Sequence, residues 1–297
     1  FLEYIGQNQA FSAIYKLNET STLRARGTKL MNFNNLETIF FAHATGFQAS
    51  MYKHFLKGFD ESFNIISLEH FGRNPKFPII DNWENQALEA IDFLENKKTP
   101  VIGLGHSMGG ILHLKAAAKR PELYKMIILL DAPVLMGRMG SILWLSKIFG
   151  LVELMSPAKK SRKRKDRWKN REEAWEYLQK NPFFARFSPD ALQDYFTYGI
   201  QDDPDRPGQV TLNISIEEEI ALFNASSHDL DFLSPKNLPP VIYFQANRRV
   251  VTSQNSIDRF VKKFKAKKIF IEGGHMFPME RPDSSQEILD IINKVIK

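Results

Sequence analysis

One short stretch constrains the fold of this chain more than any other, because it turns a buried strand sharply into a helix. Residues 100–104 (PVIGL) predict a buried strand that leads into 105–110 (GHSMGG). A helix is predicted over about 108–119, where Pro121 stops it. Glycines on both sides relieve crowding in such a turn, so that the Ser107 hydroxyl projects into a cleft. Ser107 is therefore a candidate nucleophile, and a glycine-rich turn that contains a serine by chance is the alternative.

Short apolar runs alternate with helical segments on both sides of this turn. The predicted strands cover residues 38–41, 63–68, 125–130, 240–244 and 268–271, with a further strand of a short hairpin at 10–15. The predicted helices cover 82–96, 253–265 and the residues from about 284 onwards. This rhythm predicts an α/β fold with a mostly parallel central sheet flanked by helices.

The rhythm is interrupted once, after Pro133. About 100 residues then show helical patterns and loops without a convincing series of strands. We interpret them as a helical cap over the carboxyl ends of the strands, where open α/β sheets bind ligands. The predicted organisation is a core formed by residues 1–132 and 237–297, with the cap at 133–236.

Composition excludes several classes of protein. The chain has 297 residues, 43% of them hydrophobic and 25% charged, which is typical of a globular protein. It has no cysteine, which excludes a disulfide scaffold, a thiolate zinc site and a cysteine nucleophile. We expect no metal site, because no His-rich or carboxylate cluster has ligand spacing. No apolar run is long enough to span a membrane, so we expect a cytoplasmic protein, with export after processing as the alternative.

Acyl transfer at Ser107 would need two N–H donors for the oxyanion. One would come from Met108, the residue after the nucleophile, at a helix N-terminus. The other would come from the loop 43–47 (HATGF), after the strand at 38–41. Thr45 is our candidate there, with Ala44 and Gly46 as its competitors.

The candidate base is His275, within 273–282 (GGHMFPMERP). This loop follows the last predicted strand, so it lies at the edge of the sheet from which a side chain can reach Ser107. His106 is held inside the turn and His113 lies on the helix after it. His228 is the competitor, because the cap could return beside the cleft at that point.

These motifs together resemble the α/β-hydrolase family over nearly the whole chain, in the loop HATGF, the turn GHSMGG, the loop GGHMFPMERP and the inserted cap. The sequence is most similar to a bacterial-type subgroup of capped serine hydrolases, through 72–78 (GRNPKFP) and 81–83 (DNW). The resemblance implies an α/β-hydrolase fold with the cap after the sixth strand, and ester hydrolysis through an acyl-enzyme without a cofactor. The resemblance implies that the epoxide hydrolases and haloalkane dehalogenases of this family carry Asp at the position of Ser107. The serine in this chain therefore argues against both reactions.

The chain departs from the family at the position of the acid. The resemblance places a carboxylate after the strand at 240–244, but Arg248 stands there and the next acid, Asp258, lies within a helix. Asp131, at the end of the strand 125–130, is our candidate because some members take the acid from that strand end. The alternatives are a structural Asp131 beside a Ser–His dyad supported by water, or an acid from elsewhere, including Asp229.

Positive charge is concentrated in one segment of the cap. Residues 159–171 contain nine basic residues and one acidic residue, a net +8 against +6 for the whole chain. The segment follows an apolar stretch at 141–155. Three interpretations are a lid on an anionic membrane surface, attraction of an anionic substrate such as an acyl-coenzyme A, and nucleic-acid binding, which has the least support. A solvated basic face beside a packed cap helix is the structural alternative.

The sequence therefore predicts a serine hydrolase that cleaves a small carboxylic ester or thioester with an apolar acyl group. Ser107, His275 and Asp131 form the expected triad, and the N–H groups of Thr45 and Met108 form the expected oxyanion hole. An interfacial lipase or acyltransferase, and a non-catalytic ligand-binding member of the same fold, are the rival functions. The sequence contains no signal for the oligomeric state.

Overall fold

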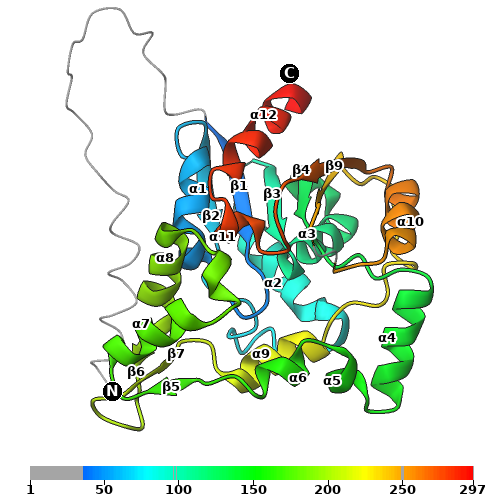
Figure 1. Ribbon diagram of the computed structural model, residues 1–297. Coiled ribbons are helices and arrows are strands. Elements are labelled where there is room, and N and C mark those ends of the chain that lie inside the picture. The colour runs from blue at the N-terminus through cyan, green and yellow to red at the C-terminus, as the bar shows by residue number, and fades with distance from the viewer. Residues whose placement is uncertain (1–35, 96, 98, 249–250, 297) are drawn as a thin grey trace, which may run out of the picture. The chain divides into compact units, whose positions relative to one another are not determined.

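A six-stranded parallel sheet lies at the centre of the protein (Figure 1). The computed structural model describes residues 36–296, except for 96, 98, 249 and 250, and the strand expected at 10–15 lies outside these residues. The strand order is β2-β1-β3-β4-β8-β9. The strands are β1 (Glu37–Ala42), β2 (Phe63–Ser67), β3 (Val101–His106), β4 (Tyr124–Leu130), β8 (Val241–Ala246) and β9 (Lys267–Ile271). The predicted parallel sheet is confirmed. The segment predicted as a cap after the sixth strand follows β4, which is the fourth strand of the described residues.

Helices cover both faces of this sheet, because side chains of each strand alternate between two apolar clusters. Phe40 of β1 packs with α2 (Glu84–Glu95), α3 (Met108–Lys119) and α10 (Gln254–Phe264). Phe41 faces the other way and packs with α1 (Lys53–Leu56) and α12 (Ser284–Ile296). Both faces of the inner strands β1, β3, β4 and β8 are therefore largely buried, which explains why their sequences are mostly apolar runs.

The segment between β4 and β8 is the one predicted as the cap, and we keep that name for it. Its helices are α4 (Arg138–Ile148), α5 (Val152–Met155), α6 (Ala158–Ser161), α7 (Arg171–Lys180), α8 (Pro189–Gly199) and α9 (Ile216–Asn224). Polar residues begin the last three of them, because the side chains of Asn170, Ser188 and Ser215 accept hydrogen bonds from backbone N–H groups of the first turn. No helix of the described residues is long and apolar enough to cross a membrane.

The cap also contains a small antiparallel sheet, which the sequence analysis did not predict. Its strands are β5 (Arg167–Trp168), β7 (Val210–Leu212) and β6 (Ile200–Asp202), in this order. Strands of two or three residues are too short to show an alternation of apolar and polar positions. The expectation of helices and loops without a convincing series of strands therefore missed this small sheet.

Candidate active site

The turn between β3 and α3 has the strained backbone that its sequence predicts. Ser107 has a φ of 53° and a ψ of −118°, values that a residue with a side chain seldom adopts. A Cβ added to Gly105 would lie 2.3 Å from the backbone of Gly109, and one added to Gly109 would lie 2.1 Å from the carbonyl oxygen of Ala42. Both glycines are therefore required by close approach of the backbone. The Ser107 N–H donates to the Leu130 carbonyl at 3.0 Å, which ties the turn to the end of β4.

Three predicted residues meet in one chain of hydrogen bonds. His275 Nε2 lies 3.1 Å from the Ser107 hydroxyl oxygen, and His275 Nδ1 lies 2.8 Å from an Asp131 carboxylate oxygen. A proton on Nδ1 satisfies both contacts, because Asp131 then accepts and Nε2 accepts from the serine. Asp131 is 2% exposed, and its other carboxylate oxygen accepts the Ala246 N–H at 3.0 Å. The carboxylate is thus held between the ends of β4 and β8.

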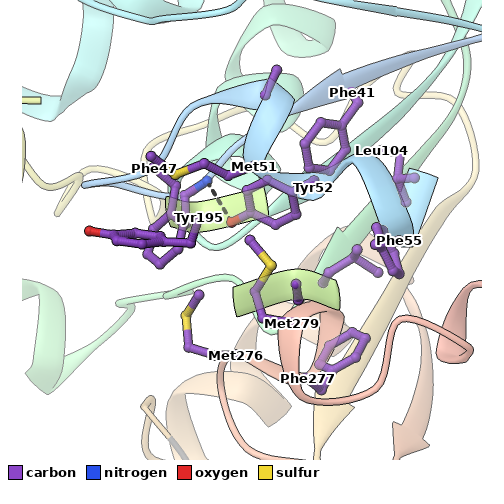
Figure 2. Packing of buried hydrophobic residues seen from close by; sticks show 14 of the residues in the cluster. Phe41, Phe47, Met51, Tyr52, Phe55, Leu104, Tyr195, Met276, Phe277 and Met279 are labelled. Carbon is purple, nitrogen blue, oxygen red and sulfur yellow. Dashed lines mark hydrogen bonds between the residues drawn. The ribbon is translucent and has the colours of Figure 1, made fainter. Parts of the chain in front are cut away.

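The loop that carries His275 is held by its own residues. The Gly274 N–H donates to the Glu280 carboxylate at 2.9 Å. Gly273 has a φ of 131°, and a Cβ there would lie 2.5 Å from the Cβ of Phe277. The short helix α11 (Phe277–Glu280) follows within this loop and packs its apolar side into the core, as Figure 2 shows for Phe277 and Met279.

His106 and Tyr52 form a second layer of contacts, which the sequence analysis did not predict. His106 Nε2 lies 2.8 Å from the His275 carbonyl oxygen, and His106 Nδ1 lies 2.8 Å from the Tyr52 hydroxyl. That hydroxyl accepts the Ala44 N–H at 3.4 Å, the dashed contact in Figure 2. Burial lowers the pKa of His106 well below its usual value, and the nearby His275 adds to this. A neutral His106 that donates from Nε2 and accepts at Nδ1 therefore links the His275 loop to the loop 43–47. No sequence signal marks Tyr52, which lies outside every motif.

The two predicted oxyanion donors lie side by side. The Thr45 hydroxyl donates to the Met108 sulfur at 3.4 Å, and both residues are buried. Of the two competitors, Ala44 already directs its N–H to Tyr52. Gly46 has a φ of 77°, and a Cβ there would lie 2.7 Å from the Glu219 carboxylate. Thr45 is the candidate whose side chain contacts Met108 at the start of α3.

Residues of the cap pack against this loop. The ring of Phe47 contacts those of Phe187 and Tyr195 at centroid distances of 6.3 and 5.5 Å, and Figure 2 shows Phe47 beside Tyr195. Behind them, Arg164 reaches the Glu219 carboxylate at 3.0 Å and the Tyr195 hydroxyl at 3.2 Å. The surroundings of the loop are thus largely aromatic, with one ion pair.

The other candidates lie away from Ser107. Arg248, at the position where the resemblance places the acid, is exposed and pairs with Glu272 at 3.7 Å. Asp258 lies on the exposed side of α10, 3.3 Å from the Lys268 ammonium.

His228 and Asp229 also make contacts elsewhere. His228 contacts Asp81 at 3.2 Å, and Asp229 pairs with Lys115 at 2.7 Å. Both residues hold the cap to the core instead of facing the site. The described residues contain no group of three or more His, Asp or Glu residues that could hold a metal ion.

Comparison with solved structures shows the same architecture at low sequence identity. The peroxisomal alpha-beta-hydrolase Lpx1 from Saccharomyces cerevisiae matches with a TM-score of 0.68 at 16% identity, covering 93% of this chain and 87% of that one. E-2-(acetamidomethylene)succinate hydrolase matches with a TM-score of 0.67 at 16% identity, covering 87% and 91%. A thioesterase domain from the curacin biosynthetic pathway matches with a TM-score of 0.61 at 16% identity, covering 86% and 90%. At such identities the likeness shows the fold.

The sequence itself matches a family model. No curated protein matches the chain significantly. The model described as the alpha/beta hydrolase family, in contrast, matches residues 39–284, which include every candidate site residue. This match supports hydrolase activity in general. The chain belongs to the α/β-hydrolase family.

Proposed function

We propose that the protein is a serine hydrolase that cleaves a carboxylic ester or thioester through an acyl-enzyme. The Ser107 oxygen attacks the carbonyl carbon while His275 Nε2 takes the hydroxyl proton. Collapse of the tetrahedral intermediate expels the alcohol or thiol, to which His275 returns the proton. A water then attacks the acyl-enzyme with His275 again as base, which releases the acid and restores Ser107.

The observation that carries this proposal is the pair of contacts at His275, 3.1 Å to Ser107 and 2.8 Å to Asp131. In this arrangement Asp131 keeps the proton on Nδ1 and stabilises the imidazolium that forms during the attack. The N–H groups of Thr45 and Met108 are the proposed oxyanion donors, because Thr45 contacts Met108, the residue after Ser107, and the α3 N-terminus favours negative charge.

The environment of the site favours an apolar acyl group. Phe47, Phe187 and Tyr195 line the cap side of the loop that holds Thr45. The proposed triad and oxyanion hole would serve ester and thioester substrates alike. A thioesterase domain and an esterase from Thermogutta terrifontis are among the structural neighbours, so both classes belong in the first assays.

The test is covalent labelling combined with turnover. We expect a fluorophosphonate to label the protein at Ser107 and a chromogenic short-chain ester to give a burst of product. Ser107→Ala should abolish both, while Ser141→Ala, which removes an exposed hydroxyl on α4, should leave both unchanged. Labelling that survives in Ser107→Ala would overturn the assignment of the nucleophile. A folded protein with neither labelling nor turnover would identify it as a non-catalytic member of the family.

A further inference from the structure

Helix α4 exposes several large apolar side chains to solvent, although its buried side already packs Leu143 against the protein. Lys147 is largely buried and pairs with Asp81, and Ser146 is buried next to it. On the other side, Trp144 is 48% exposed and Ile148 is 57% exposed. Apolar surface in water carries an unfavourable free energy, so this exposure indicates a surface that is covered in use.

The exposed apolar surface continues beyond the helix. The turn after α4 and the helix α5 carry further large apolar side chains, with Phe149 70% exposed. Figure 1 shows α4 and α5 as neighbouring green helices, and they pack against each other. We name this surface the α4–α5 face and define it by eight exposed residues: Ile142, Trp144, Leu145, Ile148, Phe149, Leu151, Leu154 and Met155.

Positive charge borders this face. Helix α6 packs against α5, and Lys159, Lys160 and Lys163 on α6 and the turn after it are exposed. Within the described part of the chain these three lysines form no ion pair. Other basic residues of the segment 159–171 do have carboxylate partners: Arg162 with Glu153, Arg164 with Glu219, Lys165 with Glu173 and Arg167 with Asp203. Part of the positive charge is thus neutralised by carboxylates of the cap, whereas the three lysines beside α5 can contact an anionic partner.

We propose that the α4–α5 face, with Lys159, Lys160 and Lys163, docks the protein onto an anionic lipid surface. An apolar stripe bordered by lysines is the combination by which amphipathic segments insert at the level of acidic headgroups. A second copy of the chain fits less well, because a symmetric contact through this face brings the two sets of lysines together. The docking is separate from the chemistry at Ser107 and does not depend on it.

The experiment is co-sedimentation of the full chain with phosphatidylcholine vesicles, with and without phosphatidylglycerol. One variant removes apolar side chains: Trp144→Ser with Ile148→Ser and Phe149→Ser. Its matched control is Leu88→Ser with Phe270→Ser, which replaces exposed apolar residues elsewhere.

The second variant removes charge: Lys159→Gln with Lys160→Gln and Lys163→Gln. Its control is Lys53→Gln with Lys57→Gln and Lys262→Gln, three exposed lysines outside the segment. Thermal melting checks that each variant is folded, independently of any activity.

We expect the wild type to bind vesicles that contain phosphatidylglycerol and to bind neutral vesicles far more weakly. The charge variant should lose about 100-fold in affinity, since each of the three lysines contributes about fivefold. The apolar variant should lose at least as much, and added salt should weaken binding of the wild type. Both controls should bind like the wild type.

Three results would overturn the proposal. They are a wild type that does not bind the anionic vesicles, controls that lose as much affinity as the variants, and a wild-type dimer that the apolar variant dissociates. The last result would assign the α4–α5 face to a second copy of the chain.

Discussion

Two residues of the proposed triad have strained backbones at the ends of adjacent strands. Ser107 follows β3 with a φ of 53°, and Asp131 follows β4 with a φ of 45°. Such conformations persist only where the surroundings hold them. Asp131 is held through its N–H, which donates to the Phe244 carbonyl at 2.8 Å, and through its carboxylate, which accepts the Ala246 N–H. The strained turn directs the carboxylate toward His275.

Asp131→Asn should lower kcat by about 10² to 10⁴, the upper end being the loss that the same change causes in a serine protease triad. The amide oxygen can still accept the Ala246 N–H, so the backbone is expected to stay in place. The amide NH₂, however, would face His275 Nδ1 and favour the tautomer with its proton toward Ser107. Steady-state turnover of a short-chain ester measures the loss, with Asp258→Asn as control. Near-normal turnover in folded Asp131→Asn would show that the acid lies elsewhere.

Tyr52→Phe should lower kcat about tenfold, because it removes the hydroxyl between the Ala44 N–H and His106 Nδ1. Tyr52 acts through other residues, so KM should change less than kcat. Tyr198→Phe, a partly exposed tyrosine of α8, is the matched control. Equal kcat values for both variants would show that the hydroxyl contributes packing alone.

At the scale of elements, helix α2 places a buried carboxylate beneath the loop after β2. Glu89 accepts the Gly72 N–H at 3.1 Å, at a glycine with a φ of 93°. Burial raises the pKa of Glu89 to about 7, against the lowering effect of that hydrogen bond, and the charge of Asp92 raises it further. The folded state therefore favours protonated Glu89, whereas the unfolded chain ionises near its ordinary pKa.

This shift predicts a pH dependence of stability. The contribution of Glu89 to the stability of the folded state is fully present below the unfolded pKa of about 4.5. It is lost as the pH rises through the folded pKa of about 7. Glu89→Gln keeps an acceptor for Gly72 but cannot ionise, so it should melt at a higher temperature than the wild type at pH 8. The difference should shrink toward pH 4.5. Melting curves across this range test it, with the exposed Glu61→Gln as control, and a difference that grows toward low pH would contradict the shift.

At the scale of the whole molecule, a buried lysine connects helix α3 to the cap. Lys115 of α3 is 1% exposed, and its ammonium lies 2.7 Å from Asp229 and 3.2 Å from Glu84. Asp229 belongs to the segment by which the chain returns from the cap. The helix that begins after Ser107 is thereby tied to the segment by which the chain leaves the cap.

Lys115→Met should lower the free energy of unfolding by about 2 kcal/mol or more, because it leaves Asp229 partly buried without its cation. Chemical denaturation measures the change. Lys119→Met is the matched control, since Lys119 pairs with the same Glu84 but is 38% exposed, and it should cost less. Equal losses in the two variants would show that burial of Lys115 adds nothing.

Much of the core could be predicted from the sequence, because its signals are local. The helix predicted at 108–119 matches α3, and the predicted strands overlap β1, β2, β3, β4, β8 and β9 within about two residues. Buried parallel strands produce continuous apolar runs, and helices produce spacings of three and four. Ser107 could be singled out for the same reason, since the strand, the turn and the helix are consecutive in the chain.

Other features depend on residues that only the folded chain brings together. Asp131 and His275 are 144 positions apart, so no local pattern shows which carboxylate faces the imidazole. The same holds for Tyr52 beside His106, and for the basic segment, where ion pairs across the cap decide which charges stay free. The sequence by itself determined the elements and the candidate nucleophile through short-range periodicity and turn chemistry. The tertiary structure decided the partners of each side chain, because hydrogen bonds and ion pairs depend on distances in space and not on separation along the chain.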